Sequence, residues 1–239
     1  MRHQPDKLQT WIGRLGGLAA LAAFTPIFLG LWRGTKRPRG RSSGNVVEWL
    51  RRPAFYFWSS LAYIGACAAS WRPLPRLLPP SAVRERLSLL IGALLYFPGL
   101  ALMLWGRLAL GRMYFVSTTG GAQLFADHQL ITRGPYSWVR HPMYLGLSMA
   151  GLGSLLIYRT WTCLWQVLIF PALVVRGRRE ELVLAAEFGE SWEAYRRRVP
   201  AWLPRLHWPG RQNAEIGEPG RLTPLPARRP SKSSRGMPC

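Results

Sequence analysis

Acidic residues are scarce in this 239-residue chain, which has 11 Asp and Glu against 32 Lys and Arg and a formal net charge of +21. Such an excess of positive charge favours a negatively charged partner, either nucleic acid or anionic lipid. Cysteines are also few, and Cys67, Cys163 and Cys239 cannot support a disulfide framework or a metal cluster. The four histidines lack metal-ligand spacing, so we expect no metal site.

A glycine-rich phosphate-binding loop after a strand-like segment is also missing, which argues against a Rossmann nucleotide site. Long apolar runs are present instead. Five stretches contain no Asp, Glu, Lys or Arg: residues 15–32, 53–71, 87–106, 142–158 and 160–175. A helix rises about 1.5 Å per residue and the hydrocarbon core is about 30 Å thick, so the first three runs reach across it. The last two, which only Arg159 separates, predict a short helical hairpin.

These runs predict an all-α fold, namely an integral membrane helical bundle of about five transmembrane helices with a cytosolic carboxyl-terminal helical segment. Basic residues gather in the loops beside the runs, as the positive-inside rule and anionic headgroups require, so nucleic acid is not the expected partner. If the spans alternate, the basic residues up to Arg198 divide into 17 on one side of the membrane and 8 on the other. We therefore expect the amino terminus outside the cytoplasm and the carboxyl terminus inside.

Chemical character changes along the chain and predicts three regions. Residues 1–106 carry no chemical motif and are predicted to form a three-helix membrane scaffold, whereas residues 107–206 hold the polar motifs of a functional core. Residues 207–239 are rich in Pro, Gly, Arg and Ser and are expected to be a disordered basic tail. Within the core, a cytosolic helix is expected to stop at Gly189, and Ser191 is expected to cap a final short helix.

A dense polar and aromatic cluster, residues 128–144, precedes the predicted hairpin. Pro142 fits the first position of a helix whose amino terminus then lies at His141. The unpaired backbone N–H groups and the positive dipole end of such a helix can hold a carboxylate. The residues alone leave a second interpretation equally open, in which Arg140 and His141 only anchor a helix end at the membrane surface.

The order and spacing of these motifs resemble the isoprenylcysteine carboxyl methyltransferase family, and the related phospholipid methyltransferases share much of the pattern. The resemblance covers residues 110–204. The matching residues are Leu110-Gly111-Arg112, Gly134-Pro135-Tyr136, Arg140-His141-Pro142-x-Tyr144, Glu180-Glu181, Phe188-Gly189, Tyr195 and Val199-Pro200. The chain departs from the family at Trp192, where many members have Tyr.

The resemblance implies a membrane-embedded, S-adenosylmethionine-dependent methyltransferase that methylates the carboxyl group of an isoprenylcysteine-like or other lipidic acceptor. It implies cofactor contacts from His128, Gln129, Leu130, Ile131, Tyr136, His141, Pro142, Met143, Tyr144 and Glu180. It also implies that Arg176 is the catalytic arginine that recognises the substrate. From the residues alone, Arg176 and Glu180 fit equally well as a surface ion pair worth about 0.3–0.5 kcal/mol.

Three other functions stay open. The first is a phospholipid or other small-lipid N-methyltransferase with the same cofactor, and the second is an NADPH-dependent reductase of the sterol-reductase type. The third is a non-catalytic protein that binds anionic membrane lipids through its Arg-rich loops. An ionised carboxylate needs no general base, whereas an amine must lose a proton, and the sequence offers no convincing base. The resemblance implies a prenylated or otherwise lipidic small-molecule acceptor, and the lack of a base favours a carboxylate over an amine as its nucleophile.

Overall fold

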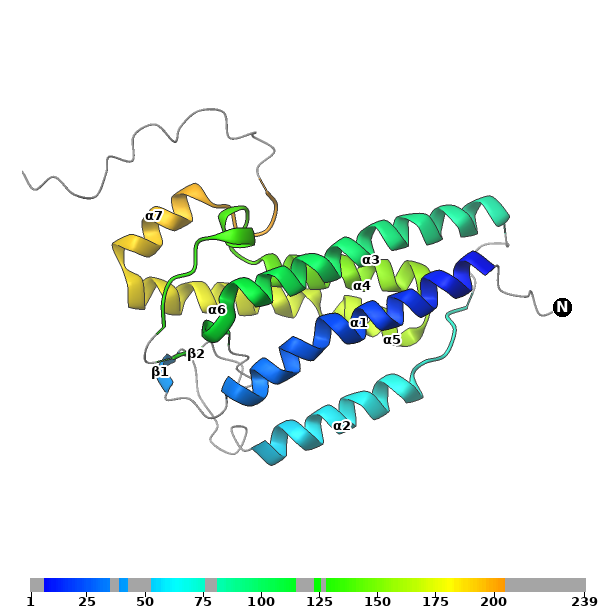
Figure 1. Cartoon of the computed structure of the whole chain (residues 1–239), viewed down its shortest axis with the longest axis horizontal. Helices are drawn as coiled ribbons and strands as arrows, with labels where there is room; N and C mark the ends of the chain where they lie inside the picture. Colours follow the sequence, from blue (N-terminus) through cyan, green and yellow to red (C-terminus); the bar gives the residue numbers. More distant parts are fainter. Residues whose placement is uncertain are drawn as a thin grey trace, which may run out of the picture. The chain divides into compact units, whose positions relative to one another are not determined.

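Helices make up most of the computed structural model, which describes residues 7–34, 39–42, 53–75, 81–114, 123–125 and 128–204. In these residues the helices are α1 (Lys7–Gly34), α2 (Pro53–Ala69), α3 (Ala82–Leu110), α4 (Pro142–Tyr158), α5 (Trp161–Leu168), α6 (Phe170–Phe188) and α7 (Glu190–Arg198) (Figure 1). Two 3₁₀ helices, η2 (Gly111–Met113) and η3 (Gly134–Ser137), and one antiparallel pair of short strands, β1 (Arg39–Ser42) and β2 (Gln123–Phe125), complete the described elements. The predicted helical class is confirmed.

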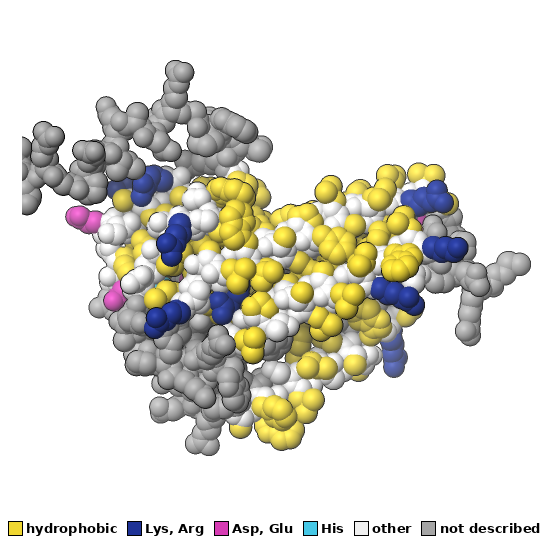
Figure 2. All heavy atoms as spheres, viewed as in Figure 1, with side chains coloured by type: hydrophobic (Ala, Val, Ile, Leu, Met, Phe, Trp, Pro, Cys, Tyr) yellow, Lys and Arg dark blue, Asp and Glu magenta, His cyan; other side chains and the backbone are white. Residues whose placement is uncertain are grey.

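The apolar surface of these helices is that of a membrane protein. The segment Ala82–Met113 is long and apolar enough to cross a membrane, and Phe57–Ala69 and Pro142–Tyr158 are shorter apolar helices among the described residues. Large hydrophobic side chains such as Trp58 and Leu94 are exposed. Figure 2 shows hydrophobic side chains over the middle of one face, with charged side chains toward its ends. Exposed apolar area of this extent is typical of a surface that contacts lipid.

The second arm of the predicted hairpin differs from the prediction. The first arm is α4 (Pro142–Tyr158), which has the predicted bounds and is followed by Arg159 as its carboxyl-terminal cap. The following apolar run is divided into the eight-residue helix α5 and the start of α6, with a turn at Ile169. Pro171 explains the break, because its ring lacks an N–H donor and clashes with the carbonyl four residues earlier. Eight residues span only about 12 Å, so α5 cannot cross a bilayer.

The end of α6 lies where the sequence predicted it. Gly189, with φ 50°, is the residue after α6, and Val199 follows the last residue of α7. The prediction that Ser191 caps the final helix is wrong, because α7 begins at Glu190 directly after Gly189. Glycine adopts a positive φ without steric cost, so one residue joins the two helices. The basic tail predicted for residues 207–239 lies outside the described residues.

Facing glycines bring α3 and α4 into close antiparallel contact. A Cβ atom on Gly99 would lie 2.6 Å from the backbone nitrogen of Ala150, and one on Gly146 would lie 2.6 Å from the Gly99 carbonyl oxygen. Gly153 approaches the Gly92 carbonyl in the same way. Small residues allow membrane helices to pack this closely. The contact holds the start of α4 beside the end of α3, where the polar cluster lies.

Helix α1 runs alongside α3 in the same direction. The Tyr96 hydroxyl donates to the Gly16 carbonyl at 3.0 Å, and Arg107 Nε donates to the Pro26 carbonyl at 3.2 Å. These two contacts pair the first half of α1 with the middle of α3, and the second half of α1 with the last turns of α3. The carboxyl-terminal half of α1 therefore lies at the same end of the bundle as the start of α4.

Candidate active site

A cavity of about 370 Å³ lies where α1, α3, α4, α6 and α7 meet the connector before α4. Nine of the eleven residues that the resemblance implied line it: His128, Leu130, Ile131, Tyr136, His141, Met143, Tyr144, Arg176 and Glu180. The structure does not bring the other two side chains to the cavity. Gln129 is exposed, and Pro142 is fully buried beside Gly106 of α3. Pro142 occupies the first turn of α4 as the sequence predicted, with His141 at the amino-terminal cap.

Three polar side chains form one hydrogen-bonded group in the cavity wall. Glu180 Oε1 accepts from the Tyr144 hydroxyl at 2.5 Å and from Arg176 Nε at 3.2 Å, and Arg176 Nε also donates to the Tyr144 hydroxyl oxygen at 2.8 Å. The Arg176 and Glu180 side chains are 27% and 29% exposed, so this is not the fully solvated pair of the alternative interpretation. Within the described part of the chain, Glu180 Oε2 makes no hydrogen bond.

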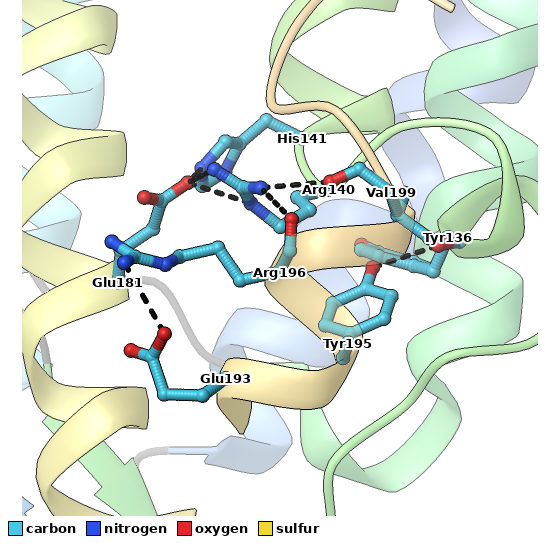
Figure 3. Close-up of polar contacts among 8 residues, drawn as sticks. All are labelled: Tyr136, Arg140, His141, Glu181, Glu193, Tyr195, Arg196 and Val199. Carbon is cyan, nitrogen blue, oxygen red and sulfur yellow. Dashed lines mark hydrogen bonds and ion pairs between the residues drawn. The ribbon is translucent and has the colours of Figure 1, made fainter. Parts of the chain in front are cut away.

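A second group, the Glu181 clasp of Arg140, His141 and Glu181, joins the start of α4 to α6 (Figure 3). Glu181 Oε1 accepts from Arg140 Nε at 3.0 Å and lies 2.9 Å from His141 Nε2. Burial alone would raise the pKa of Glu181, but the hydrogen bonds from His141 and Arg140, together with their charges, outweigh it and lower the pKa. The clasp therefore holds an ionised carboxylate, and its two partners do more than anchor a helix end.

The chain after α7 returns to the start of α4. The backbone N–H groups of Arg140 and His141 donate to the carbonyls of Pro200 at 2.8 Å and Ala201 at 3.1 Å. Arg140 Nη1 also donates to the Val199 carbonyl at 2.7 Å (Figure 3). The Arg140 guanidinium, which already pairs with Glu181, is therefore also hydrogen-bonded to a carbonyl just after α7.

Aromatic residues stabilise this junction from two sides. The Trp202 ring stacks on the His141 ring with 5.0 Å between centroids. The Tyr144 ring stacks on the same His141 ring with 5.7 Å between centroids. The Tyr195 hydroxyl donates to the Tyr136 carbonyl at 2.7 Å, and burial raises the pKa of Tyr195 to about 12, so it stays a donor at neutral pH. Trp192, the departure from the family pattern, is fully buried and lines the cavity.

An apolar wall completes the cavity, and the sequence did not predict it. Phe24 and Ile27 of α1, Met103 of α3, Leu147 of α4 and Leu173 of α6 all line the cavity. The first four also pack in the main hydrophobic core, so the wall continues into the bundle. The long apolar run in α1 gave no signal for which of its faces would meet the cavity. Trp202, which stacks on His141, was also missed, because a single tryptophan two residues after Pro200 carries no periodicity.

The residues present fit S-adenosylmethionine, the cofactor that the resemblance implies. A cavity of about 370 Å³ is within the size range of small-molecule sites. Its wall offers the Glu180 carboxylate for a cationic group and the faces of Tyr136 and Tyr144 for a positive sulfur. The first N–H groups of α4, at Met143 and Tyr144, have no acceptor within the helix and can take a carboxylate.

Comparison with known proteins agrees with this geometry. The sequence model of the phospholipid methyltransferase family matches residues 87–191. The protein-S-isoprenylcysteine O-methyltransferase of Schizosaccharomyces pombe is 36% identical over 82 residues, which are 34% of this chain and 35% of that protein. The enzyme of the same name from Mus musculus is 33% identical over 79 residues, or 32% and 28% of the two chains. The cobalt-zinc-cadmium resistance protein CzcN of Cupriavidus metallidurans is 40% identical over 85 residues, or 34% and 38%.

Residues 87–191 match the phospholipid methyltransferase family model, and this chain is similar to the isoprenylcysteine O-methyltransferases. The resemblance seen in the sequence is therefore confirmed. The matched segment spans 28–38% of the lengths of these three relatives. Residues 87–191, which the family model matches, include all of α4 and α6 and the start of α7, and α4 and α6 carry the Tyr144 group and the glutamate of the Glu181 clasp.

Proposed function

We propose that this protein is an S-adenosylmethionine-dependent methyltransferase that methylates the carboxylate of a lipidic acceptor, such as an isoprenylcysteine-like small molecule. The supporting observation is the cavity itself, in which Tyr144, Arg176 and Glu180 adjoin an apolar wall that includes Phe24 and Leu173. A lipidic carboxylate has the same two-part character. The apolar wall accepts its chain and the polar group accepts its head.

The cofactor would be held by the residues that the motif marks. His128, Leu130 and Ile131 would line one part of its site, and Glu180 Oε2 would accept hydrogen bonds from an ammonium or from hydroxyl groups. When bound, S-adenosylmethionine supplies a methyl group on a positively charged sulfur. The chain's part is to align the acceptor with that methyl group and to exclude water, because alignment lowers the barrier of a displacement reaction.

Arg176 is the residue proposed to orient the acceptor. A guanidinium binds a carboxylate through two parallel hydrogen bonds, which fix the direction of both oxygens. Its Nε donates to both Tyr144 and Glu180, so the plane of the guanidinium is set before any acceptor arrives. The acceptor carboxylate is ionised at neutral pH and attacks without a general base. Arg176 therefore positions a charge and moves no proton.

A phospholipid or small-lipid amine is the second candidate acceptor, and the name of the matching family favours it. An amine must lose a proton to become nucleophilic. The two products differ in a simple chemical property, since a methyl ester is cleaved by mild base and an N-methyl group is not.

Replacing Arg176 by lysine tests the proposal, because lysine keeps the charge but offers no planar fork. We expect methyl transfer at saturating cofactor to fall while cofactor affinity stays nearly unchanged. Arg178, exposed on the same helix, provides the matched control Arg178→Lys, which should change neither quantity. Full activity in Arg176→Lys would remove the argument for a carboxylate acceptor, and an equal loss of cofactor binding would assign Arg176 to the cofactor.

The proposal includes an orientation, with the amino terminus outside the cytoplasm and the carboxyl terminus inside. The 17-to-8 division of basic residues supports it. The cavity then opens toward the cytosol, where the cofactor is made, and residues 107–206 provide most of the site while residues 1–106 provide the membrane scaffold and part of the apolar wall. A reporter fused after Cys239 should behave as cytosolic, and a translocated reporter would contradict the orientation.

A further inference from the structure

A second cavity lies at the other end of the bundle from the candidate active site. Its volume is about 340 Å³, and Arg14, Trp71, Tyr158 and Thr160 are among the residues that line it. Helix α4 starts at the candidate active site and ends here, where the Tyr158 hydroxyl donates to the Gly13 carbonyl of α1 at 3.0 Å. The two cavities share no lining residue. Whatever the second cavity binds is therefore not the methyl acceptor in its reacting position.

Backbone hydrogen bonds build one wall of this cavity. Leu74 N donates to the Arg159 carbonyl at 2.8 Å, and Trp161 N donates to the Arg72 carbonyl at 3.1 Å. The Trp71 ring packs against the last tyrosine of α4, with 5.5 Å between ring centroids. The segment after α2 is thereby fixed to the turn between α4 and α5. The cavity is a formed feature of the fold.

Positive charge gathers at the end of the bundle that holds the second cavity, where Arg14 is a lining residue. The described segments that meet at this end carry six basic residues, Lys7, Arg14, Arg72, Arg84, Arg86 and Arg159. The same described segments carry one acidic residue, Glu85. Figure 2 shows Lys and Arg side chains gathered at the end of the bundle where α1 and α3 begin. Clustered charge of one sign raises the local concentration of the opposite charge. This end of the molecule is therefore suited to an anion.

Arg159 provides an independent indication. It follows α4 with φ 50° and ψ 49°, which is the left-handed conformation. Among the described residues, Arg159 is the one non-glycine residue with a positive φ. Glycine is the residue that commonly takes this position after a helix, because a side chain there is strained. Strained residues cluster at functional sites, and Arg159 stands in the chain between Tyr158 and Thr160, which both line the cavity.

Exposed apolar side chains on the same turns of α1 identify the kind of anion. Leu8, Trp11 and Leu15 are 44%, 62% and 52% exposed, and they lie beside Arg14 along the helix. Exposed tryptophan and leucine next to arginine are characteristic of the boundary between headgroups and acyl chains. In a phospholipid, the phosphate and the start of the acyl chains meet at this boundary.

We propose that the second cavity binds the headgroup phosphate of an anionic glycerophospholipid in the leaflet farther from the candidate active site. Arg14 and Arg159 contact the phosphate, since a guanidinium matches phosphate oxygens through paired hydrogen bonds. Trp71 and Tyr158 lie against the glycerol region. The site does not depend on the proposed methyl transfer, and lipid binding can be measured without any turnover.

Native mass spectrometry of the full chain in detergent tests the proposal, with dioleoylphosphatidylglycerol and dioleoylphosphatidylcholine as probes. We expect one retained phosphatidylglycerol and weaker binding of phosphatidylcholine. Arg14→Gln should weaken phosphatidylglycerol binding about fivefold, the effect of one basic residue near an anionic headgroup. Arg178→Gln, which removes an exposed charge from α6, is the control and should leave the affinity unchanged.

Arg159→Gly separates a binding role from a structural one. Glycine relieves the positive φ, so the variant should melt at a higher temperature without anionic lipid, yet it should bind phosphatidylglycerol about fivefold less tightly. Higher stability with unchanged lipid affinity would overturn the proposal. It would also be overturned if Arg178→Gln lost as much affinity as Arg14→Gln. Release of the lipid by inorganic phosphate at the lipid's own binding concentration would indicate a free-phosphate site instead.

Discussion

Replacing Glu181 by glutamine should weaken the junction between α4 and α6. Glu181 Oε1 lies 2.9 Å from Arg140 Nη2 and 2.9 Å from His141 Nε2, and the three side chains are only 19%, 11% and 6% exposed. Hydrogen bonds to a charged group in such surroundings contribute about 1.5–3 kcal/mol each. Glutamine keeps a neutral acceptor but leaves the Arg140 charge without its carboxylate. We expect the free energy of unfolding to fall by about 3 kcal/mol.

Unfolding of the purified protein in mixed micelles at pH 7 measures this loss. Glu193→Gln is the matched control, because Glu193 pairs with Arg196 at 3.2 Å while their side chains are 40% and 52% exposed. An exposed pair of this kind contributes about 0.5 kcal/mol. Equal losses in the two variants would refute the conclusion that the buried clasp is the stronger contact.

The pH dependence of the same comparison follows from the direction of the pKa shift. The folded protein lowers the pKa of Glu181 below its ordinary value of 4.5. A carboxylate with a lowered pKa stabilises the fold above the unfolded-state pKa, and this contribution is lost as pH falls through the folded-state value. The stability difference between the parent and Glu181→Gln should therefore be full at neutral pH and shrink below about pH 4.5. A difference that grows on acidification would contradict the assignment.

Three further changes have separate expected outcomes. Glu180→Gln should weaken S-adenosylmethionine binding about tenfold in an equilibrium titration, since a charge-assisted contact is lost, and unchanged affinity would return Glu180 to a structural role. Gly146→Leu should lower the unfolding free energy by about 1–3 kcal/mol or more because its side chain meets the α3 backbone, whereas Gly17→Leu, with open space around it, should cost far less. Phe24→Ala should raise the KM for a long-chain acceptor more than for a short-chain one and leave cofactor affinity unchanged, and equal changes for both acceptors would argue against an apolar acceptor wall.

Local signals in the sequence predicted much of the fold. The absence of charge marked the apolar helices, and Pro142 fixed the start of α4, because proline favours the first turn and cannot donate a hydrogen bond. Gly189 likewise marked the end of α6. Pro171 also indicated the break before α6. The break was not predicted, because the apolar runs were found by the absence of charged residues, and proline is uncharged.

The part of the site that depends on long-range packing could not be predicted. Spacing placed Arg176 and Glu180 one turn apart on one helix face, and the structure confirms that contact. Spacing could not show that Glu181 joins Arg140 and His141, which lie 41 and 40 residues earlier in the chain. The contribution of Phe24 depends on how α1 packs on α3, and an apolar run carries no information about its partner.

The most direct test of the proposed function is to incubate the detergent-purified protein with S-adenosylmethionine labelled in its methyl group and an S-prenylated cysteine that has a free carboxylate. We expect the label to enter the lipid fraction as a methyl ester, to be released by mild base, and to be nearly absent with Arg176→Lys but not with Arg178→Lys. Label that resists base would identify an amine as the acceptor. A folded protein that binds NADPH and not S-adenosylmethionine, with no labelled lipid, would show that this protein is not a methyltransferase.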